Sequence, residues 1–221
     1  MIRNIIFDFG GVILDLAPDR CKANFRALGF HEIDSLLTLT HQKGLLDEME
    51  RGVITAEYFC DAMREKIAAS RSADPEFAQL PLPTDEQIHQ AWCSMADGIP
   101  TYRLEAIDAL KQEGYHVSAL SNSNVLHWEC CRPLFEGAGY PSSTLFEYTW
   151  LSYEMHLVKP DPQIFARLLE ESGYIPEETL FIDDAPSNCR AAEAFGIRTF
   201  TPSIRTDWRA ELRELLAQYN S

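Results

Sequence analysis

Long apolar runs are missing from this chain of 221 residues. No stretch approaches the roughly 18–20 consecutive apolar residues of a membrane-spanning helix. The first four residues lead directly into a short apolar run and lack the layout of a secretory signal peptide. We therefore expect a cytoplasmic protein with no membrane partner.

Positive charge is also scarce. The chain has 19 lysines and arginines against 34 aspartates and glutamates, which gives a formal net charge of −15. Such a field repels the phosphate backbone of nucleic acids, so we expect no nucleic-acid partner. A small phosphorylated molecule would be repelled as well, unless its site supplies local positive charge, backbone N–H groups or a metal ion.

The six cysteines offer no recognisable metal or disulfide pattern. None of them forms a C-x-x-C pair, and Cys130 and Cys131 are adjacent. This spacing suits neither a zinc site nor a compact disulfide framework. It favours reduced, mostly buried thiols.

What the chain does have is the composition of a globular protein and a regular strand–helix rhythm. Hydrophobic residues make up 46% of it and charged residues 24%. Strands are predicted at residues 2–9, 115–120, 145–148, 179–182 and 197–200. Helices are predicted at residues 19–28, 102–112, 125–135, 162–172, 187–195 and 206–219. This alternation predicts an α/β fold, with a Rossmann-like three-layer core built on a parallel sheet.

The region between the first two strands has a different character. Residues 35–95 contain several helix-like segments, including 55–69 and 84–95, and no convincing strand. Residues 70–83 are rich in Ser, Pro and Asp, as loops are. We therefore predict a small, inserted, all-helical cap at residues 17–96 and a core made of residues 1–16 and 97–221.

Polar residues that could carry chemistry follow the predicted strands. They are Asp8, Ser121, Asn122, Lys159, Asp183 and Asp184. Ligands of open α/β sheets bind outside the carboxyl ends of the strands, so these side chains are expected to converge. Three neighbouring carboxylates need a counter-charge, and all-oxygen ligands favour Mg²⁺.

Each of these residues has an ordinary interpretation when taken alone, as a turn, a helix cap or a solvated charge. Together, at successive strand ends, they match the needs of phosphoryl transfer. Asp8 can attack phosphorus, the Ser121 hydroxyl can hold a phosphate oxygen, and Lys159 can neutralise developing charge.

Four segments carry a family resemblance: residues 7–13 (FDFGGVI), 120–124 (LSNSN), 158–162 (VKPDP) and 181–185 (FIDDA). In order and spacing they resemble the motifs of the haloacid dehalogenase-like hydrolases. The resemblance covers roughly residues 1–16 and 97–203. It implies Mg²⁺, an aspartyl-phosphate intermediate and a small phosphorylated substrate held between core and cap.

The resemblance also implies roles for individual residues. Asp8 would be the nucleophile and a metal ligand, and Gly10 would offer its backbone carbonyl to the metal. Ser121 and Asn122 would hold phosphate, Lys159 would stabilise both nucleophile and phosphate, and Asp183 with Asp184 would complete the metal shell.

One element of the family pattern is missing. Phosphatases of the family usually carry a second Asp two positions after the nucleophile as general acid and base, and here that position is Gly10. General acid–base catalysis contributes typically ~10²–10⁴-fold. The first interpretation is a phosphatase resembling those that act on sugar phosphates such as glucose 1-phosphate, with the acid supplied by water, substrate or cap.

Two alternatives remain open, and a third is disfavoured. A metal-independent 2-haloacid dehalogenase also lacks the second Asp, but it would leave the Asp183–Asp184 pair unbalanced. A weakly active binding or regulatory protein could retain fold and metal site. A two-component receiver domain is disfavoured, because its acidic pair comes on the first strand.

The cap is expected to select the substrate, because the core motifs contact only phosphate and metal. Polar candidates in the first cap helices are His41, Lys43, Gly44, Glu50 and Arg51, although such residues are usually solvated. Asp15, Asp19 and Arg20 are candidates for hinge or substrate contacts. The sequence does not indicate the oligomeric state.

Overall fold

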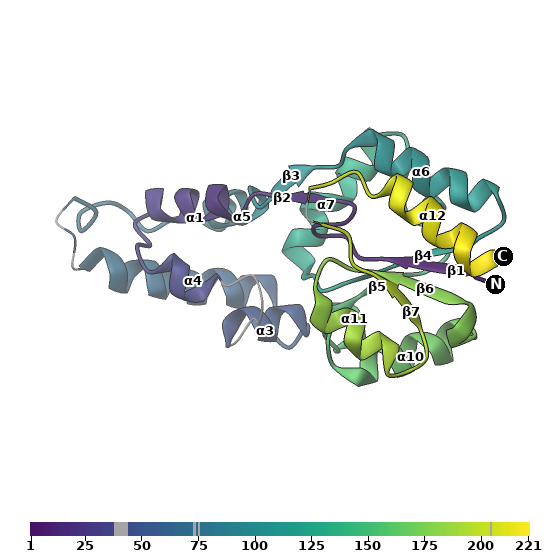
Figure 1. Ribbon diagram of the computed structural model, residues 1–221. Coiled ribbons are helices and arrows are strands. Elements are labelled where there is room, and N and C mark those ends of the chain that lie inside the picture. The colour runs from purple at the N-terminus through teal and green to yellow at the C-terminus, as the bar shows by residue number, and fades with distance from the viewer. Residues whose placement is uncertain (38–43, 73, 75, 204) are drawn as a thin grey trace.

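The computed structural model describes residues 1–37, 44–72, 74, 76–203 and 205–221, which form an α/β core beside a helical cap (Figure 1). The core contains a parallel sheet of five strands in the order β5-β4-β1-β6-β7. These strands are β1 (Asn4–Phe7), β4 (His116–Ser121), β5 (Thr149–Leu151), β6 (Thr179–Ile182) and β7 (Arg198–Phe200). The predicted α/β class is confirmed.

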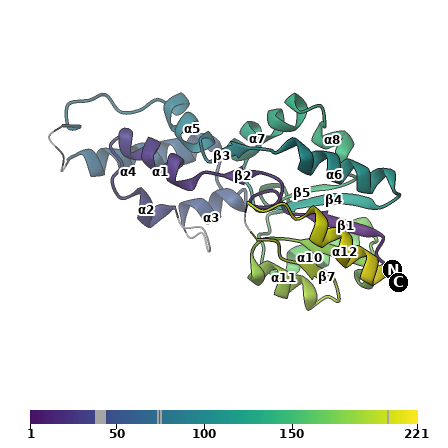
Figure 2. The same ribbon diagram turned by 45° about the horizontal axis from the view of Figure 1, so that its top comes forward.

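Burial on both faces explains why the central strands β1 and β6 are nearly continuous apolar runs. In β1, Ile5 and Phe7 point into one apolar cluster and Ile6 into the other, as the two-residue period of a strand requires. The first cluster is covered by α6 (Thr101–Gln112), α7 (Val125–Gly137) and α12 (Arg209–Asn220). The second is covered by α10 (Pro162–Ser172) and α11 (Pro186–Glu193), so the core has three layers (Figures 1 and 2).

The cap is a helical unit with its own apolar core. Its helices are α1 (Pro18–Ala27), α2 (Ile33–Leu36), α3 (Leu45–Glu50), α4 (Ala56–Ser72) and α5 (Asp85–Cys93). Phe25, Phe59 and Ile88 are fully buried between them, and Leu126 of α7 joins the same cluster. Cap packing therefore continues onto one core helix.

Two very short strands lie where the chain leaves the core and returns to it. β2 (Asp15–Leu16) pairs antiparallel with β3 (Ala96–Gly98), which the sequence did not predict. The predicted boundaries at residues 16/17 and 96/97 fall in this ladder. Salt bridges flank it: Arg103 contacts Asp15 at 2.9 Å, and Arg20 contacts Asp97 at 2.6 Å.

Two sequence predictions are wrong. The strand predicted at residues 145–148 is replaced by α8 (Ser142–Leu145) followed by β5, which pairs with the end of β4. The cysteines are not all reduced thiols, because Cys93 and Cys130 form a disulfide, while Cys21, Cys60, Cys131 and Cys189 are free and buried.

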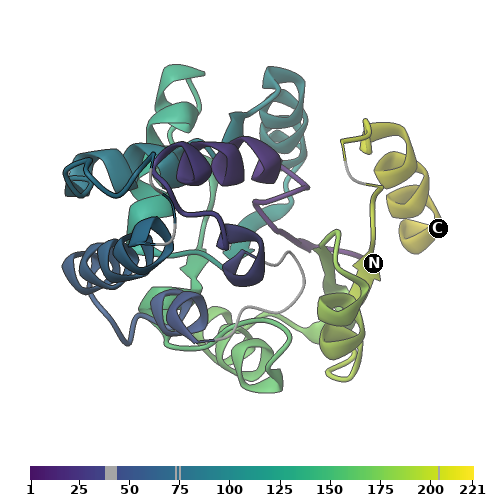
Figure 3. The same cartoon turned by 90° about the vertical axis from the view of Figure 1, so that its left-hand side faces the viewer.

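The carboxyl end of β1, and with it the ends of its parallel neighbours, faces the cap (Figure 1). Seen from the cap side, the cap helices lie in front of most of the core, and α12 stands to one side (Figure 3). None of the helices in the described residues combines the length and apolar character that a membrane crossing needs. The carboxyl ends of the strands, where the site is expected, thus form the end of the sheet nearest the cap. This end is called the cap-facing edge below.

Candidate active site

Asp8 lies directly after β1 at the edge of the sheet that faces the cap. Its backbone N–H donates to the Ile182 carbonyl at 2.8 Å, which extends the pairing of β1 with β6 by one residue. Its carboxylate Oδ1 accepts a hydrogen bond from the Phe9 N–H at 2.7 Å. The hydrogen bond from Phe9 orients the carboxylate. The residue is buried, with only 7% of its surface exposed.

Lys159 brings its ammonium group to Asp8 from the segment between α9 (Ser152–Met155) and α10. Its Nζ lies 2.8 Å from Asp8 Oδ1 and 2.7 Å from Asp183 Oδ2, and it donates to the Leu120 carbonyl at 3.0 Å. Burial alone would lower the pKa of Lys159, but the carboxylates of Asp183 and Asp8 outweigh it and raise that pKa. The group is a fixed cation at the centre of the site.

Asp183 and Asp184 follow β6. Asp183 is fully buried, and its carboxylate accepts hydrogen bonds from the Ala185 N–H at 2.8 Å and from Asn188 Nδ2 at 3.0 Å. Asn188, on α11, was not singled out from the sequence. Asp184 is half-buried and lies against Gly11, where a Cβ would come within 2.2 Å of Asp184 Oδ2.

The three aspartates form a compact acidic cluster. Asp8, Asp183 and Asp184 each offer a carboxylate oxygen, and these oxygens lie within 4.8 Å of one another. Burial raises the pKa of Asp8 to about 7 against the opposing charge of Lys159, and burial together with Asp183 raises the pKa of Asp184. With Lys159 the four side chains sum to a formal charge of −2, so an all-oxygen site for a hard divalent cation fits.

Ser121 and Asn122 follow the same edge at the end of β4. The Ser121 hydroxyl is buried and donates to the Asn122 carbonyl at 3.3 Å. The Asn122 side chain is committed to the Lys159 main chain: Nδ2 donates to the carbonyl at 2.9 Å, and Oδ1 accepts from the N–H at 2.8 Å. The Asn122 side chain therefore positions Lys159. That Asn122 binds phosphate stays a prediction, and its backbone N–H is the group left to do so.

The cap meets this edge through Ser152, which the sequence did not reveal. The Ser152 hydroxyl accepts from the Ser123 N–H at 2.9 Å and donates toward the carbonyls of Glu50 at 2.7 Å and Ser123 at 2.9 Å. A Cβ on Gly52, in the cap, would lie 2.2 Å from the Tyr153 carbonyl. These contacts hold the end of α3 against α9, so Glu50 lies next to the core.

The remaining candidates have other positions. His41 and Lys43 lie outside the described residues. Gly44 is exposed, and the Arg51 guanidinium is bonded to Asp47 at 3.1 Å in the same helix. His127 lies near the start of α7, and burial lowers the pKa of its imidazole to about 4. Asp15 and Arg20 form the salt bridges beside β2 and β3 described above, and a hinge or substrate role for them and for Asp19 stays a prediction.

The comparisons with known proteins agree with this geometry. The haloacid dehalogenase-like hydrolase family matches residues 2–196. A D-ribitol-5-phosphate phosphatase from Bacteroides thetaiotaomicron is 35% identical over 218 residues, which cover 98% of this chain and 99% of the relative.

Two solved structures are similar over nearly the whole chain. A wild-type enzyme of the same family from Bacteroides thetaiotaomicron, in complex with magnesium and inorganic phosphate, has 37% identity and a TM-score of 0.85, over 96% of this chain and 100% of that one. A hydrolase of this type from Porphyromonas gingivalis has 31% identity and a TM-score of 0.85, over 98% of each chain. This protein therefore belongs to the haloacid dehalogenase-like hydrolases.

Proposed function

We propose that this protein is a Mg²⁺-dependent phosphatase that hydrolyses a small sugar-alcohol phosphate, with D-ribitol 5-phosphate as the first candidate. The observation that carries the proposal is the buried cluster of Asp8, Lys159, Asp183 and Asp184 at the cap-facing edge of the sheet. The relative that acts on ribitol 5-phosphate matches the whole chain, and it moves the substrate class from sugar phosphates of the glucose 1-phosphate type to sugar-alcohol phosphates.

The metal would be held by Asp8, the Gly10 carbonyl and the Asp183–Asp184 pair. The Asp183 oxygens already accept bonds from Lys159, Asn188 and Ala185, so Asp184, at the accessible side of the cluster, is the better direct ligand. When bound, Mg²⁺ supplies positive charge to both nucleophile and phosphate. The positive charge of the bound ion would also make the site compatible with an anionic substrate in a protein of net charge −15.

The protein groups would divide the phosphoryl transfer between them. An oxygen of Asp8 attacks phosphorus, the bond from phosphorus to the leaving oxygen breaks, and an aspartyl-phosphate forms. The Lys159 ammonium, which lies 2.8 Å from Asp8 Oδ1, neutralises charge on the phosphoryl group. The Ser121 hydroxyl and the N–H groups that follow it hold the remaining oxygens. Water then hydrolyses the aspartyl-phosphate and restores the Asp8 carboxylate.

A metal-independent dehalogenase is a weaker candidate. It would leave the cluster with two uncompensated negative charges in a buried site, which is costly. A binding protein without turnover would keep the same metal site, so it differs from a phosphatase only in releasing no phosphate.

A direct test of the substrate class is the ratio of kcat/KM values for D-ribitol 5-phosphate, D-ribose 5-phosphate and D-glucose 1-phosphate in the presence of Mg²⁺. We expect the open-chain polyol phosphate to be hydrolysed with the highest kcat/KM. Equal or higher values for the two cyclic sugar phosphates would overturn the assignment of a sugar-alcohol phosphate while leaving the phosphatase intact.

Gly11 gives a test of the metal site that does not depend on turnover. It has φ of +79°, and an alanine Cβ would collide with the Asp184 carboxylate. We expect Gly11→Ala to weaken Mg²⁺ binding, measured by calorimetry, about 10–100-fold, as changes beside metal ligands do. Gly137→Ala is the control, because a Cβ there meets no atom within 4 Å. Unchanged Mg²⁺ affinity in Gly11→Ala would show that Asp184 is not a metal ligand.

The proton for the leaving group needs a source other than residue 10. A Cβ on Gly10 would already approach Leu16 Cδ1 to 3.1 Å, so the position is crowded as well as lacking an acid. We propose Glu50 for this role. It ends α3, is seated on the core through Ser152, and is close enough to Lys159 for the two charges to interact.

The ionisation of Glu50 suits an acid at neutral pH. Burial, with a smaller contribution from Asp47, raises the pKa of its carboxyl to about 7, while Lys159 and Arg51 lower it. A carboxyl with that pKa holds a proton in much of the population at pH 7 and can take it back when water attacks. Since the acid acts protonated, the corresponding limb of the pH–rate profile should fall as pH rises above about 7.

Glu50→Gln separates this role from a structural one. We expect kcat for a polyol phosphate to fall about 10²–10⁴-fold, whereas p-nitrophenyl phosphate, whose leaving group needs no proton, should lose far less in its first step. The alkaline limb assigned to Glu50 should also disappear. Glu48→Gln, at an exposed position of the same helix, is the matched control. Equal losses for the two substrates in kcat/KM, which reports the step that releases the leaving group, would exclude Glu50 as the acid.

A further inference from the structure

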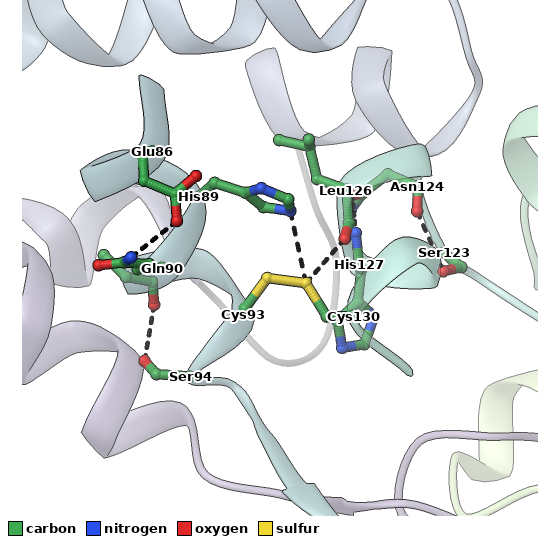
Figure 4. Close-up of a disulfide and its surroundings, with 11 residues drawn as sticks. Glu86, His89, Gln90, Cys93, Ser94, Ser123, Asn124, Leu126, His127 and Cys130 are labelled. Carbon is green, nitrogen blue, oxygen red and sulfur yellow. Dashed lines mark hydrogen bonds between the residues drawn. A yellow bond between two sulfur atoms is a disulfide. The ribbon is translucent and has the colours of Figure 1, made fainter. Parts of the chain in front are cut away.

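A disulfide joins the cap to the core. Cys93 is the last residue of α5 in the cap, Cys130 lies on α7 in the core, and their Cα atoms are 5.7 Å apart (Figure 4). Both residues are partly exposed, in contrast to the four free cysteines, which are buried. The chain itself passes between cap and core at β2 and β3, so the disulfide adds a covalent link at a separate place.

The surroundings of the disulfide are those of a reactive sulfur pair. His89, one helical turn before Cys93 on α5, has its Nε2 atom 3.5 Å from Cys130 Sγ (Figure 4). From this position a ring N–H can donate to a thiolate, which stabilises the ionised form of a cysteine. His89 and Leu126 also line an open cavity of about 160 Å³ beside the pair, although neither sulfur of the pair lines it.

The tethered helix leads directly to the active site. α7 begins at Asn124, whose Oδ1 caps it by accepting from the His127 N–H at 2.9 Å. Asn124 follows the Ser121–Asn122 edge, and Cys130 lies about 9 Å further along the helix axis at the usual rise per residue. The cap side of α7 is held as well, because Leu126 packs inside the apolar cluster of the cap.

Access to the nucleophile depends on movement around this junction. Asp8 is 7% exposed and Lys159 is 4% exposed, beneath an edge on which the end of α3 is seated. With Asp8 this little exposed, a phosphorylated polyol has a wider path to it when cap and core separate in part. A covalent bond between α5 and α7 opposes that separation.

We propose that Cys93 and Cys130 form a thiol–disulfide exchange site that takes a low-molecular-weight thiol, such as glutathione, as its reductant. In the oxidised protein the cap is tethered to α7, and in the reduced protein it moves more freely.

The exchange is balanced as follows. A thiolate of the reductant attacks Cys93 Sγ, a new S–S bond forms there, and the bond between Cys93 and Cys130 breaks. Its electron pair leaves on Cys130 Sγ beside His89, which supplies a hydrogen bond or a proton. A second thiolate attacks the mixed disulfide and releases Cys93. Two molecules of thiol are thereby oxidised to one disulfide, and the protein gains two thiols.

The test uses the full-length protein equilibrated in glutathione buffers that range from fully oxidised to fully reduced. Differential alkylation with peptide mass spectrometry reports the state of Cys93 and Cys130, and amide hydrogen exchange reports how firmly α5 and α7 are docked. We expect both cysteines to change state together and the oxidised protein to exchange several-fold more slowly at the end of α5 and the start of α7. We expect kcat to be several-fold lower in the oxidised protein.

Variants make the result specific. Cys130→Ser and, independently, Cys93→Ser should behave like reduced protein in every buffer. Cys21→Ser, at a fully buried free thiol of α1 in the cap, should respond like the wild type. The kcat arm rests on the proposed phosphatase function, but the alkylation and exchange arms do not. The proposal is overturned if the two thiols stay reduced in glutathione disulfide, or if oxidation leaves amide exchange at α5 and α7 unchanged.

Discussion

Replacing Asp8 with asparagine is expected to lower Mg²⁺-dependent phosphate release at least about 10³-fold, because loss of a covalent nucleophile is among the most damaging changes in an enzyme. The amide cannot form a phosphorylated intermediate and cannot balance the charge of Lys159. The fold should survive, since Lys159 keeps its contact with Asp183 at 2.7 Å and the β1–β6 pairing uses only main-chain groups.

Initial rates on D-ribitol 5-phosphate, together with the Tm of each protein, measure this effect. Asp108→Asn, an aspartate of α6 outside the cluster, is the control for a change from carboxylate to amide. An Asp8→Asn protein that keeps its Tm and retains more than about a tenth of the rate would show that Asp8 is not the nucleophile.

Replacing Lys159 with methionine is expected to have the largest effect on stability. The side chain is almost wholly buried, and its loss leaves the carboxylates of Asp8 and Asp183 without the cation that contacts both. Removing one partner of a buried ion pair typically costs about 3–5 kcal/mol. Methionine keeps an apolar stem beside the Phe181 ring, 5.5 Å from the Lys159 ammonium in the wild type, so the charge is the main change.

Chemical denaturation with and without Mg²⁺ makes this prediction specific. Because added Mg²⁺ can replace part of the lost positive charge, it should raise the free energy of unfolding of Lys159→Met more than that of the wild type. Lys66→Met, at an exposed position of α4, should have little effect in either condition. Wild-type stability in Lys159→Met would contradict the account of Lys159 as the counter-charge of the cluster.

The sheet and its edge were largely predictable, because β1 and β6 are buried on both faces and appear in the sequence as uninterrupted apolar runs. The edge strand β5 was predicted in the wrong place. The apolar and aromatic residues extend from Leu145 to Leu151, and only pairing with Ala119–Ser121 decides which of them form the strand. β2 and β3 are too short to show an alternation of apolar and polar residues. They form because the segments that leave and re-enter the core run side by side.

The site was predictable where charge and strand position coincide. Asp8 and Asp183 directly follow buried strands, and Lys159 shortly precedes α10; in the structure the Lys159 ammonium lies 2.8 Å and 2.7 Å from their carboxylates. Ser152 and Asn188 were not predicted, since serine and asparagine occur throughout the chain. Ser152 gains its role from its contact with the cap, and Asn188 from its contact with Asp183.

The disulfide escaped for a related reason. Cys93 and Cys130 are separated by 37 positions and belong to different units, which only the folded chain brings together.

The most direct measurement of the central claim is phosphate release from D-ribitol 5-phosphate by the wild-type protein, first with Mg²⁺, then with a chelator, and then after Mg²⁺ is restored. The account predicts release with Mg²⁺, its loss on chelation and its recovery on re-addition, because it assigns the acidic cluster of Asp8, Asp183 and Asp184 to a divalent cation. Release that persists in chelator, or halide release from a 2-haloacid under the same conditions, would contradict it.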